Sequence, residues 1–219
     1  MNIHTIILAG GKGTRMLSQK AKVLQALGGK TMLNHVMKAA NKISNKISVV
    51  VGFDKEGVEE EIKKIGINAN TFLQKEQIGT ADAVKTTLQD IDKNEKVLIL
   101  YGDVPLIKEE TLKKLCNQES DLSILTTNLE NPTGYGRTLK DKENNVLGII
   151  EEKDADSEQK KIKEIFTGIL VAKGNVLKRY IPEINDNNSA KEFYLTDLIG
   201  IAHKNGFKIN TLSLSLIHI

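Results

Sequence analysis

The chain has 219 residues, 40% of them apolar and 27% charged, and its 31 basic and 28 acidic side chains give a formal net charge of +3. This length suits one large domain, and so balanced a charge argues against nucleic acid as a partner. There is no membrane-spanning apolar run and no signal-peptide pattern. The single cysteine, Cys116, excludes an internal disulfide, so we expect a cytoplasmic protein.

Strands and helices alternate in the first part of the chain. Apolar runs predict strands at 3–9, 47–51, 71–73, 97–101 and 121–128. Apolar periodicity and turn residues predict helices at 32–40, 54–65 with Asp54 as its N-cap, 80–88 and 109–116. This order predicts an α/β fold in three layers, with helices on both faces of a mostly parallel sheet.

The pattern of predicted elements changes after residues 131–134. Two strand-like runs flank the polar turn 141–145 and predict a hairpin, and the charged segment 153–163 predicts a solvated loop or exposed helix. A strand at 165–172 and a helix at 193–203 follow. We find no linker, so we expect a single domain, 1–219, whose second half covers the first.

A glycine-rich loop follows the first strand. Residues 8–15 read Leu-Ala-Gly-Gly-Lys-Gly-Thr-Arg, so backbone N–H groups can converge on an anion such as a phosphate chain. The loop fits neither the Walker pattern nor the dinucleotide pattern, which would require glycine at Met16. Arg15 and Lys22 add two positive charges and favour a nucleotide site over an ordinary strand-to-helix turn.

Other polar clusters also follow predicted strands, where ligands collect in such sheets. Asp103, after the strand at 97–101, is a candidate Mg²⁺ ligand or a helix cap. Gln74, Gly79 and Thr80 bracket a turn that suits either the edge of a nucleobase or a polar turn with a cap.

A third cluster, 134–137, could press its backbone against a flat ligand such as a sugar ring, and Glu151 could accept hydrogen bonds from sugar hydroxyls. Both could equally be surface structure. The sequence has no Ser/His/Asp or Cys/His pattern for a covalent intermediate. An anion loop, two cations and a metal carboxylate suit phosphoryl or nucleotidyl transfer.

The motifs together resemble the pyrophosphorylase half of the bacterial bifunctional UDP-N-acetylglucosamine pyrophosphorylase/glucosamine-1-phosphate acetyltransferases. The resemblance is collinear from about residue 3 to 209 and is carried by the runs 8–16, 22–24, 74–83, 100–107, 131–137, 150–155 and 192–197. It implies a Rossmann-like nucleotidyltransferase fold. It also implies transfer of the uridylyl group of UTP to N-acetylglucosamine 1-phosphate with Mg²⁺, for peptidoglycan and lipopolysaccharide precursors.

The resemblance also implies residue roles. Arg15 and Lys22 stabilise the phosphates during catalysis, and Asp103 holds the metal. Gly136 and Glu151 hold the sugar. The nucleotide is expected to contact Leu8, Ala9, Gly10, Gly11, Lys22, Gln74, Gly79, Thr80, Tyr101, Gly102 and Asp103.

The chain departs from the family pattern in several places. Phe166 stands where the family has an asparagine at the sugar, so we expect Phe166→Asn to raise turnover of the sugar phosphate about ten-fold, unless Phe166 simply packs. Ala21 replaces a proline and Lys191 a glycine. The residues at 213–219 match nothing in the family, which continues to a second metal ligand and an acetyltransferase domain. We therefore expect a C-terminally truncated domain with a tail that is truncated or artefactual.

Two alternatives stay open. The same loop could serve another sugar 1-phosphate, or the fold could act as a nucleotide-sugar-binding module with weak catalysis. Arg15, Lys22 and Asp103 argue for an enzyme, whereas Phe166 and the tail argue for the module. A homo-oligomer is expected only with the missing C-terminal domain, and neither membrane nor nucleic acid is an expected partner.

Overall fold

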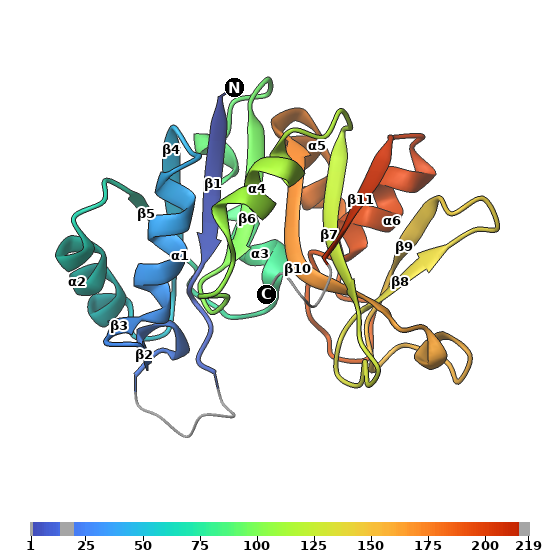
Figure 1. Ribbon diagram of the computed structural model, residues 1–219, viewed down its shortest axis with the longest axis horizontal. Coiled ribbons are helices and arrows are strands. Elements are labelled where there is room, and N and C mark those ends of the chain that lie inside the picture. The colour runs from blue at the N-terminus through green and yellow to red at the C-terminus, as the bar shows by residue number, and fades with distance from the viewer. Residues whose placement is uncertain (1, 14–19, 215–219) are drawn as a thin grey trace.

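The computed structural model describes residues 2–13 and 20–214, in which a central sheet lies between two layers of helices (Figure 1). The strand order along the sheet is β11-β7-β10-β6-β1-β4-β5. These strands are β1 (Ile3–Leu8), β4 (Lys46–Val51), β5 (Asn70–Leu73), β6 (Lys96–Tyr101), β7 (Leu122–Asn128), β10 (Glu164–Lys173) and β11 (Ile209–Leu214). The predicted hairpin is β8 (Arg137–Lys140) with β9 (Val146–Ile150), and it joins the sheet at β10.

The predicted mostly parallel sheet is confirmed. β1 pairs in parallel with β4 and β6, β4 with β5, and β7 with β11. β10 is the exception and runs antiparallel between β6 and β7. Its first residues pair with the hairpin through Ile165 and Arg137, so the chain enters β10 from the end of the sheet at which β6 and β7 finish and has to run back.

Helices cover both faces of the sheet. They are α1 (Met32–Asn41), α2 (Lys55–Ile65), α3 (Thr80–Lys85), α4 (Glu109–Cys116), α5 (Gly174–Tyr180) and α6 (Asp197–Lys204). α3, α5 and α6 pack on one face, and α1, α2 and α4 on the other. Successive β1 residues alternate between the two cores, with Ile6 in one and Ile7 in the other, so the strand is buried along its whole length.

Local sequence signals account for several boundaries. Thr31 is the last residue of the short hairpin formed by β2 (Ala26–Leu27) and β3 (Lys30–Thr31), and it caps α1 by accepting a hydrogen bond from Asn34 N at 3.1 Å. Asp54 is the N-cap residue of α2, as predicted, and its carbonyl accepts from Val58 N at 3.0 Å. Its side chain makes no capping hydrogen bond, because the carboxylate accepts from the distant Ala21 N at 3.1 Å.

The second half of the chain differs more from the prediction. α6 begins at Asp197, four residues later than expected, because residues 193–196 are used for backbone and side-chain contacts with other segments. Helix α5 and strand β11 had no sequence prediction. β11 pairs in register with β7 from Ile209 to Leu214, so the described part of the unmatched tail belongs to the sheet.

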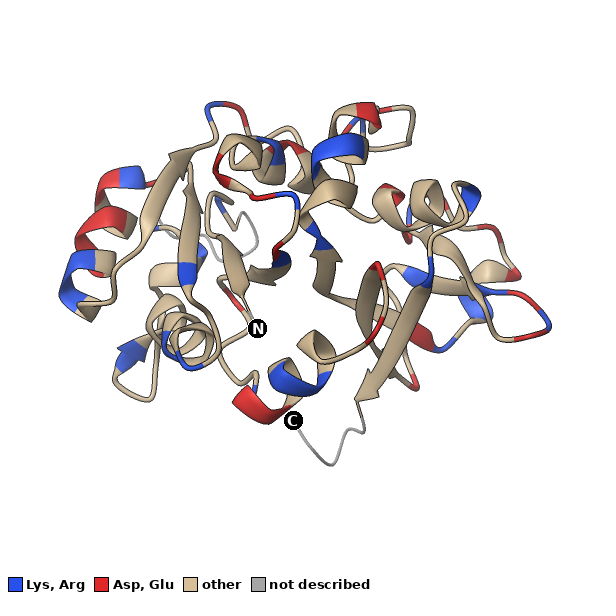
Figure 2. Cartoon of the chain, turned by 90° about the horizontal axis from the view of Figure 1, so that it is seen from above, with Lys and Arg blue, Asp and Glu red and all other residues tan. Residues whose placement is uncertain are grey.

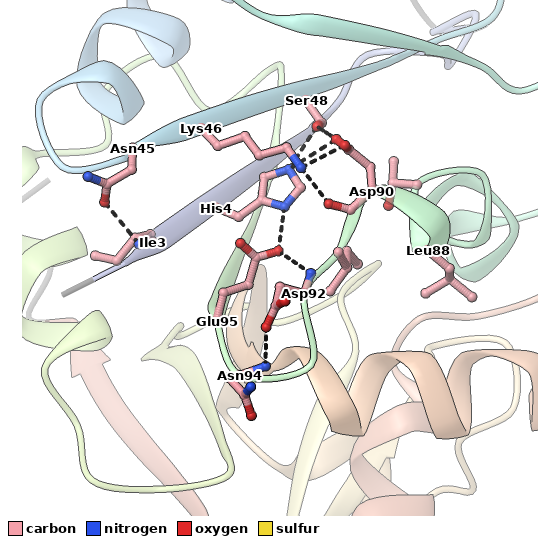
Figure 3. A network of polar contacts seen from close by, with 12 residues as sticks. Ile3, His4, Asn45, Lys46, Ser48, Leu88, Asp90, Asp92, Asn94 and Glu95 are labelled. Carbon is pink, nitrogen blue, oxygen red and sulfur yellow. Dashed lines mark hydrogen bonds and ion pairs between the residues drawn. The ribbon is translucent and has the colours of Figure 1, made fainter.

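A buried polar network closes the amino ends of β1, β4 and β6 (Figure 3). His4, with no exposed surface, contacts Glu95 Oε1 through Nδ1 at 2.9 Å and Ser48 Oγ through Nε2 at 2.7 Å. Lys46 Nζ lies 2.6 Å from Asp90 Oδ1, and the Ser48 hydroxyl can donate to Asp90 Oδ2 at 3.0 Å. Burial lowers the pKa of His4, and the hydrogen bond to Glu95 opposes that shift.

Basic and acidic residues are interspersed along the elements (Figure 2). Within residues 2–13 and 20–214, no helix combines the length and the apolar character needed to cross a membrane. Cys116, the last residue of α4, is buried in the core, and burial raises the pKa of its thiol to about 11.

Candidate functional site

A cleft of about 520 Å³ opens at the carboxyl ends of the parallel strands. It is lined by Leu8, Ala9, Gly10, Gly11, Lys12, Gly13, Lys22, Val23, Gln74, Gln77, Gly79, Thr80, Ala83, Tyr101, Asp103 and Glu192. The loops that follow β1, β5 and β6 meet here, because the parallel pairing of β1, β4, β5 and β6 brings their ends to one edge.

Ten of the residues expected to contact nucleotide line this cleft. Gly102 does not line it: its N–H donates to Leu8 O at 2.9 Å, and a Cβ there would approach Val23 Cγ1 at 2.8 Å. Gly102 therefore ties the end of β6 to that of β1. Arg15 lies outside the described residues, so its role stays a prediction from the sequence.

Lys22 and Asp103, which both line the cleft, form an ion pair. Lys22 Nζ lies 2.6 Å from Asp103 Oδ2, with side-chain exposures of 41% and 27%. Both charges therefore remain open to solvent and to a ligand. Gly13, with φ +64, allows this approach, because a Cβ there would lie 2.6 Å from Lys22 Cβ. The pair offers a cation for a phosphate and a carboxylate for a metal ion.

Gln74 occupies the floor of the cleft and is only 5% exposed. Its Nε2 donates to Gly79 O at 3.0 Å and to Asp82 Oδ2 at 2.9 Å. The sequence led us to expect that this amide could both donate and accept at a base edge. In the structure both hydrogens are committed within the protein, and Oε1 faces Gly10.

Gly79 and Thr80 are held by the segment that precedes α6. Phe193 N donates to Ile78 O and its carbonyl accepts from Ala81 N, both at 2.8 Å. A Cβ on Gly79, at φ +142, would lie 2.5 Å from Phe193 N, so only glycine fits. Thr80 Oγ1 accepts from Leu195 N at 2.9 Å, so this hydroxyl links two segments and does not cap its own helix.

Tyr101 forms the wall between this region and β10. Burial raises the pKa of its phenol to about 12, although a hydrogen bond with Thr80 acts in the opposite direction. A Cβ on Gly168 of β10 would lie 2.7 Å from the Tyr101 ring. The phenol is therefore a neutral group throughout the physiological range.

Gly136 and Glu151 lie together, outside the residues that line the cleft. A Cβ on Gly136 would meet both Glu151 carboxylate oxygens at 3.4 Å. The Thr196 hydroxyl donates to Glu151 Oε1 at 2.9 Å. Burial raises the pKa of Glu151, and Asp197 and Asp154 add to that shift. The structure thus brings together Gly136 and Glu151, the two residues predicted to hold the sugar. Residues 193–196 link them to Thr80 in the cleft.

Phe166 packs in the core. Its ring is 6% exposed and belongs to the same cluster as Ile149 and Leu170, and its N–H donates to Gly136 O at 2.9 Å. This placement favours packing over a contact with the sugar.

Six residues that line the cleft were absent from the predicted site: Lys12, Gly13, Val23, Gln77, Ala83 and Glu192. Gln77 Nε2 donates to Gln74 O at 3.1 Å and so supports the base-side loop. Lys12 Nζ lies 5.4 Å from the centre of the Phe53 ring. All six stand within sequence runs that were identified, so they could have been predicted by including every residue of each run.

The fold and the cleft define an α/β domain of the class that binds a phosphorylated ligand at the carboxyl edge of its sheet. A family model for the MobA-like NTP transferase domain matches residues 5–158. The chain belongs to this family.

Relatives and a solved structure agree with that assignment. The chain is 44% identical over 213 residues to the bifunctional protein GlmU of Ruthia magnifica subsp. Calyptogena magnifica. It is 46% identical over 213 residues to GlmU of Francisella tularensis subsp. novicida (strain U112). Both matches cover 96% of this chain but 46% of the relative, so the chain spans about half the length of these curated relatives.

The fold also resembles that of a putative glucose-1-phosphate thymidylyltransferase from Bacillus anthracis, solved in complex with sucrose. The TM-score is 0.76 at 20% identity, covering 97% of this chain and 87% of that one. At this identity the likeness concerns the fold alone, which is the nucleotidyltransferase fold expected from the sequence.

Proposed function

We propose that this domain is a uridylyltransferase that joins UTP to N-acetylglucosamine 1-phosphate and releases pyrophosphate. The observation that carries the proposal is the Lys22–Asp103 pair beside the glycine loop, with one cation and one carboxylate open at the point where a phosphate chain would lie. The match to GlmU relatives across this chain supports the choice of nucleotide and sugar.

The reaction needs no nucleophile from the protein. A phosphate oxygen of the sugar phosphate forms a bond to the α-phosphorus of UTP, and the bond from that phosphorus to the pyrophosphate oxygen breaks. Catalysis then consists of positioning and charge neutralisation. We assign Lys22 and Arg15 to the phosphate charge, and the backbone of residues 10–13 to the phosphate chain.

The donor set fits Mg²⁺. Asp103 contacts Lys22 through Oδ2, and its side chain is partly exposed in the cleft. Residues 2–13 and 20–214 hold no group of three or more His, Cys, Asp or Glu side chains placed to bind a metal, so a fully protein-made cage is lacking there. Mg²⁺ commonly takes one or two carboxylates together with substrate phosphates. When bound, it supplies further neutralisation of phosphate charge.

The sugar side is assigned to Gly136 and Glu151. The partly buried carboxylate of Glu151, fixed by Thr196, is an acceptor for sugar hydroxyls. The alternative of another sugar 1-phosphate rests on the sequence at Phe166, because the amide that the family pattern has at the sugar is missing there.

The test is release of pyrophosphate from UTP and Mg²⁺ with N-acetylglucosamine 1-phosphate, glucosamine 1-phosphate or glucose 1-phosphate. We expect the first to be preferred. Preference for another sugar phosphate would replace the acceptor, and binding of UTP without turnover would support a binding module.

Lys22→Ala should lower kcat about 100-fold and change the Kd for UTP far less, since charge stabilisation is used in the transition state. Lys64→Ala, on the exposed face of α2, is the matched control. If Lys22→Ala weakens only UTP binding, Lys22 serves binding and not catalysis.

A further inference from the structure

The orientation of the Gln74 amide is fixed by two groups that can only accept. Its Nε2 donates to the backbone carbonyl of Gly79 at 3.0 Å and to the carboxylate of Asp82 at 2.9 Å. In a flipped amide, Oε1 would face both of these oxygens. A carbonyl and an ionised carboxylate have no hydrogen to donate, so the contacts would be repulsive. The amide therefore has one stable orientation.

This orientation determines what the cleft offers a ligand. With both hydrogens committed, Gln74 presents only its carbonyl oxygen, and Oε1 lies 3.2 Å from the point that a Cβ of Gly10 would occupy. Gly10 lines the cleft, so the oxygen faces the cleft beside the glycine loop. A buried acceptor here requires a donor on the ligand.

Asp82 stands behind this contact. It lies in the first turn of α3 and does not line the cleft, so its effect on a ligand passes through Gln74. The other anchor, the carbonyl of Gly79, is set by the main chain, where contact with Phe193 leaves room for no other residue. Asp82 is thus the side chain on which the orientation depends.

We propose that Asp82 is a positioning residue for nucleobase selection, which holds Gln74 Oε1 as an acceptor for a ring N–H. Among pyrimidines, uracil and thymine carry a hydrogen on N3, whereas cytosine has a lone pair there and would face Oε1 with two acceptors. The inference rests on the proposed function, since it places the base of the nucleotide substrate at Gln74.

Asp82 also has a plain structural role. An acidic residue in the first turn of a helix is favourable to the helix dipole, so its removal lowers stability whatever the cleft binds. A loss of activity or stability alone cannot separate the two roles. The preference for UTP over CTP does separate them, because a loss of helix stability affects both nucleotides alike.

The experiment compares the dissociation constants of UTP and CTP by calorimetry, and their kcat/KM values, in the wild type, Asp82→Asn and Asp82→Ala. Loss of a hydrogen bond to a charged group should reduce the UTP preference about ten-fold in Asp82→Ala. Asp82→Asn keeps the shape and one acceptor oxygen, and should fall between. Glu56→Gln, which removes a charge from the first turn of α2, should leave the preference unchanged.

The outcomes are distinct. An equal loss for both nucleotides in the Asp82 variants overturns the inference, as does a wild type that binds UTP and CTP equally. Turnover of neither nucleotide by the wild type overturns the proposed function. Measured binding preferences then still decide the role of Asp82, and binding of neither nucleotide rejects both.

Discussion

The two ends of the parallel strands are built for opposite purposes. At the carboxyl ends, Lys22 and Asp103 form an ion pair that stays partly exposed. At the amino ends, His4 and Glu95 form a pair that is almost fully buried, with Ser48, Lys46 and Asp90 around it. Charges left open can act on a ligand, whereas charges enclosed can act only on the fold. Substitutions at the two ends should therefore separate turnover from stability.

The largest effect is expected at the open end. Asp103→Asn removes the proposed metal ligand and should lower turnover about 10,000-fold or more, or ~5.5 kcal/mol. Its free energy of unfolding should change by less than about 1 kcal/mol, because a partly exposed ion pair contributes little. Steady-state pyrophosphate release and denaturant unfolding measure the two quantities. Glu143→Gln, in the exposed turn after β8, is the control; normal turnover in Asp103→Asn would remove the assignment.

The closed end should respond in the reverse way. His4→Leu leaves the Glu95 carboxylate buried beside Asp92 N alone and should lower the free energy of unfolding by about 3–5 kcal/mol. Turnover per folded molecule should stay normal. Urea unfolding with specific activity at low temperature checks both, and a variant that keeps its stability but loses activity would break the comparison.

Substitutions of Phe166 test whether the ligand site at the carboxyl ends of the parallel strands includes this residue of β10. Phe166→Asn removes a buried ring and buries an amide, so we expect a loss of about 3 kcal/mol and no gain with N-acetylglucosamine 1-phosphate. Phe166→Leu should lose about 1 kcal/mol. A ten-fold rise in turnover, the result expected from the family pattern, would place this side chain at the sugar after all.

The smallest effect is the pH dependence. The lowered pKa of His4 means that its contribution is complete above its unfolded pKa of about 6.5 and is lost as the pH falls through the folded pKa. Glu151 and Asp197 have raised pKa values, so their contributions have the opposite sign and are lost as the pH rises through theirs.

The pH dependence is isolated by comparing His4→Asn with the wild type. The difference in the free energy of unfolding between the two proteins should shrink from pH 7.5 to pH 5. We expect this change to be smaller than the losses of stability predicted for His4→Leu and Phe166→Asn. Parallel stability curves would show that His4 does not titrate in this range.

Features that depend on residues close together in the sequence could be predicted. Strand β1 and the start of α1 follow from local apolar patterns and a local cap, and the glycine loop from its own spacing. The direction of the Gln74 amide and the late start of α6 depend on partners far along the chain, such as Asp82 and Phe193. Asp54 shows the same limit, since Ala21 N takes its carboxylate. Cysteine and histidine spacing gave no signal for the His4 network, because its members meet only in the folded sheet.

Because β1 lies between β4 and β6 in the sheet, it is synthesised well before one of its two partner strands. His4 and Glu95 are 91 residues apart, so at ~5–20 residues per second a ribosome needs roughly 5–18 s to add the second after the first. During that interval β1 can pair with β4 but has no β6 on its other side. A mostly apolar strand with one unpaired edge can pair with the wrong strand. Until β6 is made, the nascent chain therefore carries one edge of its central strand without its native partner.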